Sequence, residues 1–392
     1  MIRNKISRRR MLQTSITAGG VALFGLDRVP VPEFQTKPQV ALRGGRLLGQ
    51  VEFIDESSVP LDTLMGEGLD GRLFTDLSSV GPDHPTTPTQ KFYVRTRASS
   101  LLNTRGPWQI KLEGGLNKSG TIDIPALQKL SRPMGLHLME CSGNVRAAHF
   151  GMLSVADWAG VPISKVLDQA GARKPSSRVL ISGFDEYSDP SETSQPGASW
   201  IFTADELTAA RSFLALSMSG AELTRDHGAP VRLVVPGWYG CTCIKWVNEI
   251  QLVNDDAPAT SQMHEFASRT MQAGEPDLAK EYRPAAIEQA AMPVRIEKWS
   301  VDSKIHYRVN GIAWGGSRPR GDLEIRFNAD EKFVPVENFQ HRFNDPWSFW
   351  SHTWKPEKPG MYDLQLRLKD DSIPARRLKR GYYVRSVRIS EI

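Results

Sequence analysis

The stretch "LTRDHGAPVRLVVPGWYGCTCIKW" spans residues 223–246 and joins a basic turn to strand-like segments. Its apolar runs, continued by "VNEIQLV", predict a strand, a tight Pro-Gly turn and a second strand over residues 230–253. Asp226, His227, Arg232 and Lys245 surround this glycine-rich turn. Arginine and lysine at loop ends, with glycines that permit close backbone approach, suit a phosphate-bearing ligand. A solvated hairpin is the alternative interpretation.

A second stretch, "LHLMECSGNVRAAHFG" (136–151), places Cys141 before a Ser-Gly-Asn turn. Cys141 could be a buried small hydrophobic residue, a nucleophile served by His137 or His149, or a metal ligand. Arg146 would favour the thiolate that the last two roles need. Because the sequence has no H-x-x-x-H or H-E-x-x-H motif, a metal bound by Cys141 would need its other ligands from a cofactor.

Outward from these stretches, strand and helix patterns mix without regular alternation, which predicts an α+β fold. We expect a strand over 91–98, a helix starting near Pro125, a helix over 155–171 and a strand over 178–185. Thr203 and Glu206 form a capping-box pattern before another helix. Beyond residue 289, six or so short alternating segments between Gly, Pro and Asp turns predict an immunoglobulin-like β-sandwich.

The N-terminus and the composition limit the partners. The net charge of +5 equals the five basic side chains of "MIRNKISRRR", so the rest of the chain is net neutral and offers no electrostatic argument for nucleic acid. A twin arginine before the short apolar run 16–26 is typical of a twin-arginine export signal, which predicts a periplasmic protein. That run is too short to span a membrane. Three cysteines are too few for a disulfide framework.

"ECSGNVR", "RDHGAPVRLVVPG", "GCTCIKW", "AMPVRIEKW" and "GIAWGG" together resemble the sulfite oxidase family of molybdopterin-dependent oxidoreductases, including its sulfane dehydrogenase branch. The resemblance covers about residues 91–392. It implies a molybdenum–molybdopterin cofactor with Cys141 as the metal ligand. It also implies Arg95, Arg146 and Arg380 as substrate arginines. The cofactor would be bound by Tyr93, Val94, Arg95, Thr96, Arg97, Cys141, Asp185, His227, Arg232, Cys243, Ile244 and Lys245.

The resemblance also implies a domain order. Residues 1–30 would be the export signal, 31–90 an extension, 91–260 the molybdopterin-binding domain, 261–288 a linker and 289–392 an immunoglobulin-like dimerisation domain that forms a homodimer. No C-x-x-C-H motif occurs, so no haem is expected in this chain. Electrons from a sulfur oxyanion substrate such as sulfite would therefore pass to a separate c-type cytochrome.

Some residues depart from the family pattern. Arg95-Thr96-Arg97 stands where the animal enzymes have Arg-Asn-His, and Phe266 and Ala148 stand near the positions of two substrate-side aromatic residues. Two alternatives remain open: a periplasmic reductase of sulfoxides such as methionine sulfoxide, and a non-enzymatic binding module. The second alternative would use an exposed aromatic patch formed by Trp347, Phe349, Trp350 and Trp354; core and dimer contacts are the other interpretation of these residues.

Overall fold

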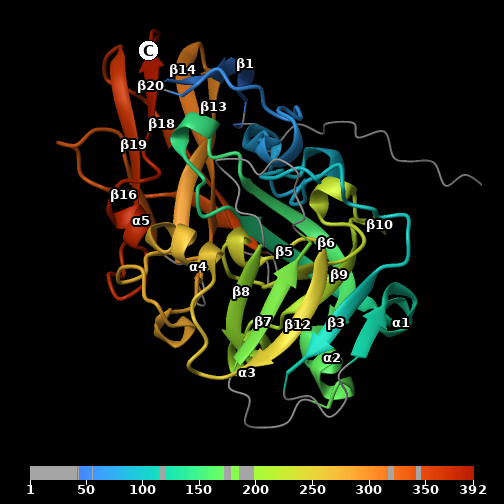
Figure 1. Ribbon diagram of the computed structural model, residues 1–392. Coiled ribbons are helices and arrows are strands. Elements are labelled where there is room, and N and C mark those ends of the chain that lie inside the picture. Colours follow the sequence, from blue (N-terminus) through green and yellow to red (C-terminus); the bar gives the residue numbers. More distant parts are fainter. Residues whose placement is uncertain are drawn as a thin grey trace, which may run out of the picture. The chain divides into compact units, whose positions relative to one another are not determined.

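A computed structural model describes residues 42, 44–54, 56–114, 120–171, 178–184, 198–316, 322–340 and 346–392. The predicted export signal and Asp185 therefore lie outside the described residues. Within those residues, four five-stranded sheets provide most of the regular structure and the helices are short (Figure 1). One unit extends over Ala41–Ile392, so the predicted boundaries at 261 and 289 stay predictions.

The first sheet contains the start of the Cys141 stretch, because residues 136–140 form the second half of β5. Its order is β10-β9-β6-β5, with β11 paired to β9, and all of its pairs are antiparallel. Cys141 directly follows β5, and Arg232 opens β11. The strands are β5 (Arg132–Glu140), β6 (Leu153–Pro162), β9 (Phe213–Met218), β10 (Ala221–Glu222) and β11 (Arg232–Val234).

The second sheet, ordered β4-β3-β12-β7-β8, is mixed. Its β12–β3 pair is parallel, and its other pairs are antiparallel. Because β12 begins just after Lys245 and Trp246, the lysine is fixed at the start of a central strand. The strands are β3 (Gln109–Glu113), β4 (Gly120–Asp123), β7 (Arg178–Gly183), β8 (Ser199–Thr203) and β12 (Val247–Val253).

Two further sheets contain the strands beyond residue 289, together with two strands from the predicted extension. The first has the order β1-β13-β14-β18-β17: β1 (Arg46–Val51), β13 (Ala290–Val301), β14 (Lys304–Trp314), β18 (Trp347–Trp354) and β17 (Glu337–Gln340). The second has the order β16-β15-β19-β20-β2: β16 (Val334–Pro335), β15 (Leu323–Arg326), β19 (Gly360–Leu368), β20 (Arg385–Ile389) and β2 (Phe53–Ile54). Residues 46–54 thus complete sheets whose other strands lie more than 230 residues further along the chain.

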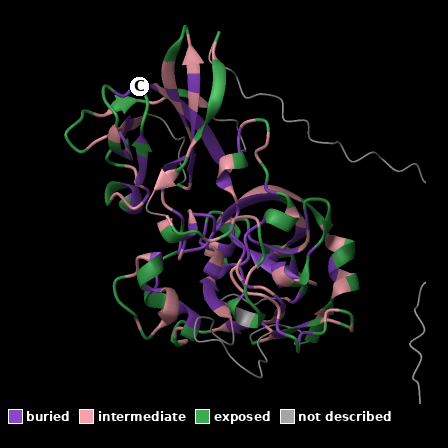
Figure 2. Ribbon diagram, turned by 90° about the horizontal axis from the view of Figure 1, so that it is seen from above, coloured by how far each residue is buried: buried purple, intermediate pink, exposed green. Residues whose placement is uncertain are grey.

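These two sheets pack together through aromatic side chains. Trp354 of β18 stacks on Phe327 with ring centroids 4.2 Å apart and meets Tyr362 of β19 edge-on at 4.7 Å. Trp347, Phe349, Trp350 and Trp354 are all buried, and Figure 2 shows buried residues along the strands of both sheets. The four aromatic residues therefore belong to the core and form no exposed patch, which removes the feature on which the binding-module alternative depended.

The helices are α1 (Ile124–Leu130), α2 (Ile163–Gln169), α3 (Ala204–Ala209), α4 (Ser261–Phe266) and α5 (Arg376–Lys379). None of those described is long and apolar enough to cross a membrane. Two expectations were wrong. The helix expected over 155–171 is the second half of β6 followed by α2, since β6 is buried on both faces and its apolar run does not alternate. Residues 91–98 form only an isolated bridge, between Val94 and Leu73, where a strand was expected.

The predicted capping box begins α3. The Thr203 Oγ1 accepts a hydrogen bond from the Glu206 amide (3.0 Å), and the Glu206 carboxylate accepts one from the Thr203 amide (2.7 Å). Replacing Thr203 by alanine is expected to lower the free energy of unfolding by about 1 kcal/mol, because one amide at the helix start loses its partner. Thr208→Ala in the same helix is exposed and should change it by less than about 0.5 kcal/mol. Equal losses in urea denaturation would contradict this prediction.

Candidate active site

Cys141 lies in a turn that its own backbone holds in place. The Cys141 amide donates to the Met152 carbonyl at 3.0 Å, and the Cys141 carbonyl accepts from the Asn144 amide at 2.9 Å. The Asn144 side chain in turn accepts from the Met152 amide at 3.0 Å. This pairing fixes the segment that leaves β5 against the start of β6. The thiol is therefore at a strand end, as the sequence indicated, and is 5% exposed.

The thiol faces a cavity of about 860 Å³, including the part open to solvent, which we call the cysteine cavity. Its lining combines thiols, aromatic rings and cationic side chains. Eight residues expected from the sequence to bind a cofactor line it: Tyr93, Arg95, Thr96, Cys141, Arg232, Cys243, Ile244 and Lys245. The other lining residues are Met139, Ala198, Gly240, Cys241, Trp246, Gln262, Glu265 and Phe266.

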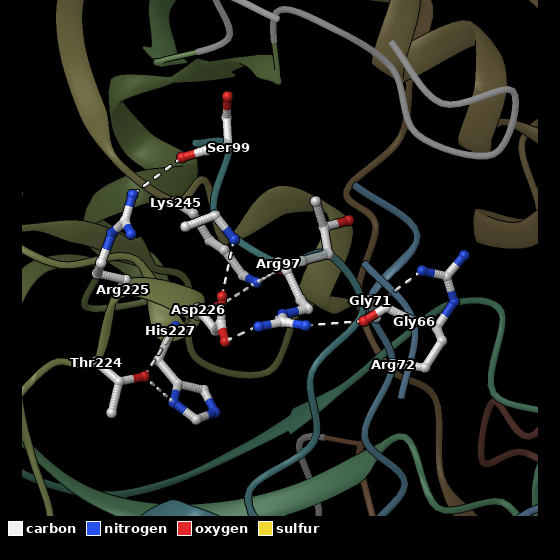
Figure 3. A network of polar contacts seen from close by, with 12 residues as sticks. Gly66, Gly71, Arg72, Arg97, Ser99, Thr224, Arg225, Asp226, His227 and Lys245 are labelled. Atoms are coloured by element: carbon white, nitrogen blue, oxygen red, sulfur yellow. Dashed lines mark hydrogen bonds and ion pairs between the residues drawn. The ribbon is translucent and has the colours of Figure 1, made fainter. Parts of the chain in front are cut away.

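Segments far apart in sequence are tied together beside this cavity (Figure 3). The Lys245 Nζ donates to the carbonyl oxygens of Thr96 (2.6 Å) and Asp226 (2.5 Å). The Asp226 Oδ1 accepts from the Ala98 amide at 2.8 Å, and its Oδ2 is 3.7 Å from Arg97 Nε. The stretch 93–98 is thus held against 226–245 by groups that the sequence had placed in separate motifs.

Arg232 and Lys245 bring two positive charges to the lining of the cysteine cavity. Arg232 is buried and donates to the carbonyls of His227 (3.0 Å) and Cys243 (3.1 Å), while its Nε has no hydrogen-bond partner among the described residues. Burial, together with the neighbouring positive charge of Arg232, lowers the pKa of Lys245 to about 7. Positive charge gathered in this way favours an anionic ligand such as a phosphate.

A second cavity, of about 1370 Å³ including its open mouth, adjoins the first, and we call it the arginine cavity. Arg95 and Glu265 line both cavities. Its remaining lining is Arg72, Ser142, Gly143, Val145, Ser268, Arg269, Met271, Arg377, Arg380 and Tyr382. A Cβ built on Gly143 would lie 3.8 Å from both Arg269 Nη1 and Cys141 Sγ, so the arginine reaches the vicinity of the thiol. Five guanidiniums against one carboxylate make this cavity suited to an anion.

The thiol itself is balanced between two influences. Burial raises the pKa of Cys141, whereas the Gly143 amide and the charges of Arg95 and Arg269 favour the thiolate. A cation arriving at the thiol would shift this balance further, because a bound metal stabilises the deprotonated ligand. Among the described residues, no three His, Cys, Asp or Glu side chains converge on a potential metal ion.

Some predicted site residues support the cavities from outside. His227 is buried: its Nε2 lies 3.1 Å from the Phe92 carbonyl and its Nδ1 lies 2.7 Å from Thr224 Oγ1. Burial lowers its pKa to about 4, so the ring is neutral. Arg97 donates to the Gly66 carbonyl at 2.8 Å, and Val94 is buried in the core. These residues position Tyr93, Arg95 and Thr96, and cofactor contact by them stays a prediction.

Arg146 differs from the other expected substrate arginines. It lies in the turn Arg146–Ala148, where its charge acts on Arg385, and it is in the lining of neither cavity described above. Its substrate role stays a prediction without a contact to support it. Arg95 and Arg380, by contrast, both line the arginine cavity. The two residues that replace the family's substrate-side aromatic residues lie in different places. Ala148 is buried in the core, and Phe266 lines the cysteine cavity.

Sequence reasoning missed several lining residues, chiefly Arg72, Gln262, Glu265, Arg269 and Arg377. Gln262, Glu265 and Arg269 fall in 261–288, which looked like a polar linker and gave no signal. Arg377 lies three residues before Arg380, the expected substrate arginine. It donates from Nη2 to the carbonyls of Ser142 (2.7 Å) and Arg269 (2.8 Å), so it links the cysteine turn to the 268–270 turn.

Comparisons with known proteins agree with this site. Residues 99–261 match the family model of the oxidoreductase molybdopterin binding domain. The mitochondrial sulfite oxidase of Drosophila melanogaster is 23% identical over 330 residues, covering 78% of this chain and 56% of that protein. The catalytic subunit MsrP of the protein-methionine-sulfoxide reductase of Xanthomonas campestris is 30% identical over 258 residues, covering 63% of this chain and 70% of that protein.

In the crystal structure of the sulfane dehydrogenase SoxCD from Paracoccus pantotrophus, one chain has the same fold, with a TM-score of 0.61 and 17% identity over 88% of this chain and 90% of that one. The chain spans about half the length of the mitochondrial sulfite oxidases of Drosophila and Homo sapiens, 56% and 46% respectively. Fold and site together define a molybdopterin-binding oxidoreductase. The chain belongs to the sulfite oxidase family.

The residues present fit the family's cofactor. A soft thiol for molybdenum, a basic cluster for a phosphate and a cavity of the size that ligands occupy are found together. Arg232 contributes a buried Nε with no hydrogen-bond partner among the described residues, which an anionic or carbonyl-bearing ligand could satisfy. Gly240 leaves room beside Tyr93, because a Cβ there would lie 2.5 Å from the phenolic oxygen.

Proposed function

We propose that this chain is an exported oxidoreductase that oxidises sulfite, or a related sulfur oxyanion or sulfane group, by oxygen-atom transfer. The observation that carries the proposal is the Cys141 thiol at the junction of a phosphate-suited cavity and an arginine-lined cavity. Electrons would leave to a separate c-type cytochrome, and export would use the twin-arginine signal. The relatives named sulfite oxidase and sulfane dehydrogenase support a sulfur substrate.

In this proposal each group of residues has one task. The molybdenum cofactor supplies oxygen-atom transfer and takes up two electrons when it is bound. Cys141 would hold the metal as a thiolate, and Arg232 and Lys245 would hold the phosphate of the pterin. Arg95, Arg269 and Arg380 orient the anionic substrate and offset its charge as the negative oxygens rearrange.

The test is the metal content of the full chain from a host that makes the cofactor, followed by sulfite-dependent reduction of a c-type cytochrome. The proposal predicts about one molybdenum per chain and turnover that saturates with sulfite. A folded, metal-free preparation from such a host would overturn it. Periplasmic activity that disappears when Arg8 and Arg9 are both replaced by lysine would support export.

Reduction of sulfoxides is the second candidate, and the similarity to the methionine-sulfoxide reductase subunit favours it. A neutral sulfoxide gains little from five guanidiniums, whereas a sulfur oxyanion gains charge-assisted hydrogen bonds. Comparing kcat/KM for sulfite oxidation with that for methionine sulfoxide reduction separates the two. A higher value for the sulfoxide would reverse our assignment.

We also propose that the sheets beyond residue 289 form an immunoglobulin-like domain through which two copies of the chain associate. Their packed aromatic core and the predicted family architecture support this. Light scattering after size-exclusion chromatography should give twice the chain mass of 43.7 kDa. A monomer at micromolar concentration would contradict it.

Lys245 should control how firmly the cofactor is retained. Replacing it by methionine removes a charge-assisted hydrogen bond worth about 1.5–3 kcal/mol, so we expect roughly 10–100-fold weaker retention of the pterin. Because an anion favours the charged amine and the pKa is about 7, retention by the unmodified protein should weaken as the pH rises above 7. Lys280→Met, at an exposed lysine, is the control. Pterin content after gel filtration at several pH values measures both effects; a pH-independent result would contradict the second.

A further inference from the structure

Glu265 lies where the two cavities meet. It lies in the last turn of α4 and lines both the cysteine cavity and the arginine cavity. Among the described residues that line either cavity, it is the single carboxylate. It therefore borders both the space suited to the cofactor and the space suited to the substrate anion.

One oxygen of the Glu265 carboxylate, Oε2, is buried and makes no hydrogen bond to a described residue. Burial raises the pKa of Glu265, while the charges of Arg269 and Arg95 act in the opposite direction. The Arg269 guanidinium lies 5.2 Å from the ring centroid of Phe266, the residue next to Glu265, so the cation is held close by. A buried acceptor beside two cations can take up a proton or a hydrogen bond from water without rearrangement.

The other titratable groups facing these cavities are poorly suited to exchange a proton. The pKa values of Tyr93, Cys241 and Cys243 are raised by burial, so these groups stay protonated. Lys245, with a pKa of about 7, titrates near neutral pH, but its Nζ is held by the carbonyls of Thr96 and Asp226, and it does not line the arginine cavity. Tyr382 donates to the Asn144 carbonyl, and burial raises its pKa. The six arginines that line the cavities offer only hydrogen-bond donors, because a guanidinium has no acceptor for a proton. His264, on the same helix, is engaged with Tyr282 at 3.3 Å.

We propose that Glu265 is the base that accepts a proton from the reacting water. This rests on the proposed function, in which sulfite and one water give sulfate, two protons and two electrons. One proton passes to the Glu265 carboxylate and then to solvent through the arginine cavity; the other goes directly to bulk water. The two electrons leave to two molecules of a one-electron ferric haem carrier. Phe266 has no hydroxyl, and the carboxylate next to it supplies the proton acceptor.

The experiment compares the unmodified holoenzyme with Glu265→Gln, Glu265→Asp and the exposed control Glu275→Gln, all at measured molybdenum content. Glu265→Gln should lower kcat for sulfite about 100-fold, because a positioned base contributes at least that factor. It should also remove the fall in kcat at low pH, since only an ionised carboxylate accepts a proton. Glu265→Asp should keep that pH limb, and Glu275→Gln should match the unmodified enzyme.

A purely electrostatic role gives a different pattern. If Glu265 only balances the arginines, Glu265→Gln would lower KM for the anion and leave kcat and its pH limb unchanged, which would overturn the proposal. If the unmodified enzyme contains molybdenum and does not oxidise sulfite, the proposed function fails and the proposal fails with it. If the parent oxidises sulfite, the proposed function holds, and the kcat of Glu265→Gln then tests the role of Glu265 by itself.

A measurement without turnover tests the carboxylate directly. A folded-state pKa above the unfolded one means that Glu265 stabilises the fold at low pH and that this stability is lost as the pH rises through the folded value. Glu265→Gln has no such loss, so the difference in Tm between variant and parent should increase with pH over that range. Glu275→Gln should show no such trend. A Tm difference that does not change with pH would mean that Glu265 does not hold a proton more tightly when folded, and it would count against the proposal.

Discussion

Replacing Cys141 by serine is expected to abolish sulfite turnover while much of the pterin stays bound. Substituting a residue that only supports a metal ligand already costs about 10–100-fold, so removing the thiolate itself should cost more than about 100-fold. Arg232, Lys245 and the segment around Tyr93 line the same cavity and would still hold the pterin. Molybdenum and pterin per chain, measured together with kcat, check the prediction.

Cys243→Ser is the matched control, because Cys243 lines the same cavity and its sulfur accepts from the Val235 amide at 3.4 Å. It should keep its molybdenum. X-ray absorption at the molybdenum edge should lose one sulfur neighbour in Cys141→Ser and none in Cys243→Ser. Full turnover in Cys141→Ser, or an equal loss of sulfur in both variants, would contradict the assignment of Cys141 as the ligand.

The largest effect on stability is expected at Arg385. Its Nε and Nη2 contact the two oxygens of Glu56 at 2.6 and 2.5 Å, and both side chains are almost fully buried. His149 contributes a further contact to Glu56 at 2.7 Å. Replacing Arg385 by methionine leaves a buried carboxylate without its guanidinium, which should lower the free energy of unfolding by about 3–5 kcal/mol. Denaturation in urea measures the loss.

The pair Arg367–Glu324 provides the comparison, because its arginine is exposed although Glu324 is only 12% exposed. It has the same chemistry at 2.7 Å, but Arg367 is 51% exposed. Arg367→Met should cost less than about 1 kcal/mol, because solvent screens the pair. The double variant Arg385→Met, Glu56→Gln should recover part of the stability, since it buries no unpaired charge. Equal losses at the two arginines would show that burial of Glu56 does not matter.

Much of the chemistry near Cys141 follows from local sequence. The Ser-Gly-Asn turn places Cys141 at a strand end. Arg232 and Lys245 reach one cavity because the Leu233 amide donates to the Ile244 carbonyl at 2.7 Å and so closes the loop between them. The capping box at Thr203 formed as predicted because it needs only four consecutive residues. Such features depend on contacts within a few positions, which a single sequence displays directly.

Features that depend on two-sided burial were harder to predict. Residues 155–162 have apolar spacing compatible with a helix, yet they form β6 between two neighbouring strands. The stretch 46–54 lies in the predicted extension, where no strand was expected although five of its nine residues are apolar, and it completes two sheets. The spacing of apolar residues alone does not reveal which strands a segment will pair with.

The sequence by itself determined the thiol, the basic cluster and the family, because these are carried by residue types in short, fixed spacings. Only the tertiary structure decided which side chains share the cavities. It moved His227 and Arg97 to supporting positions, left Arg146 outside both linings, and brought Glu265 and Arg269 in from a segment that looked like a linker. The reason is physical: a cavity is formed where separate elements pack, so its lining is set by long-range contacts that no local pattern records.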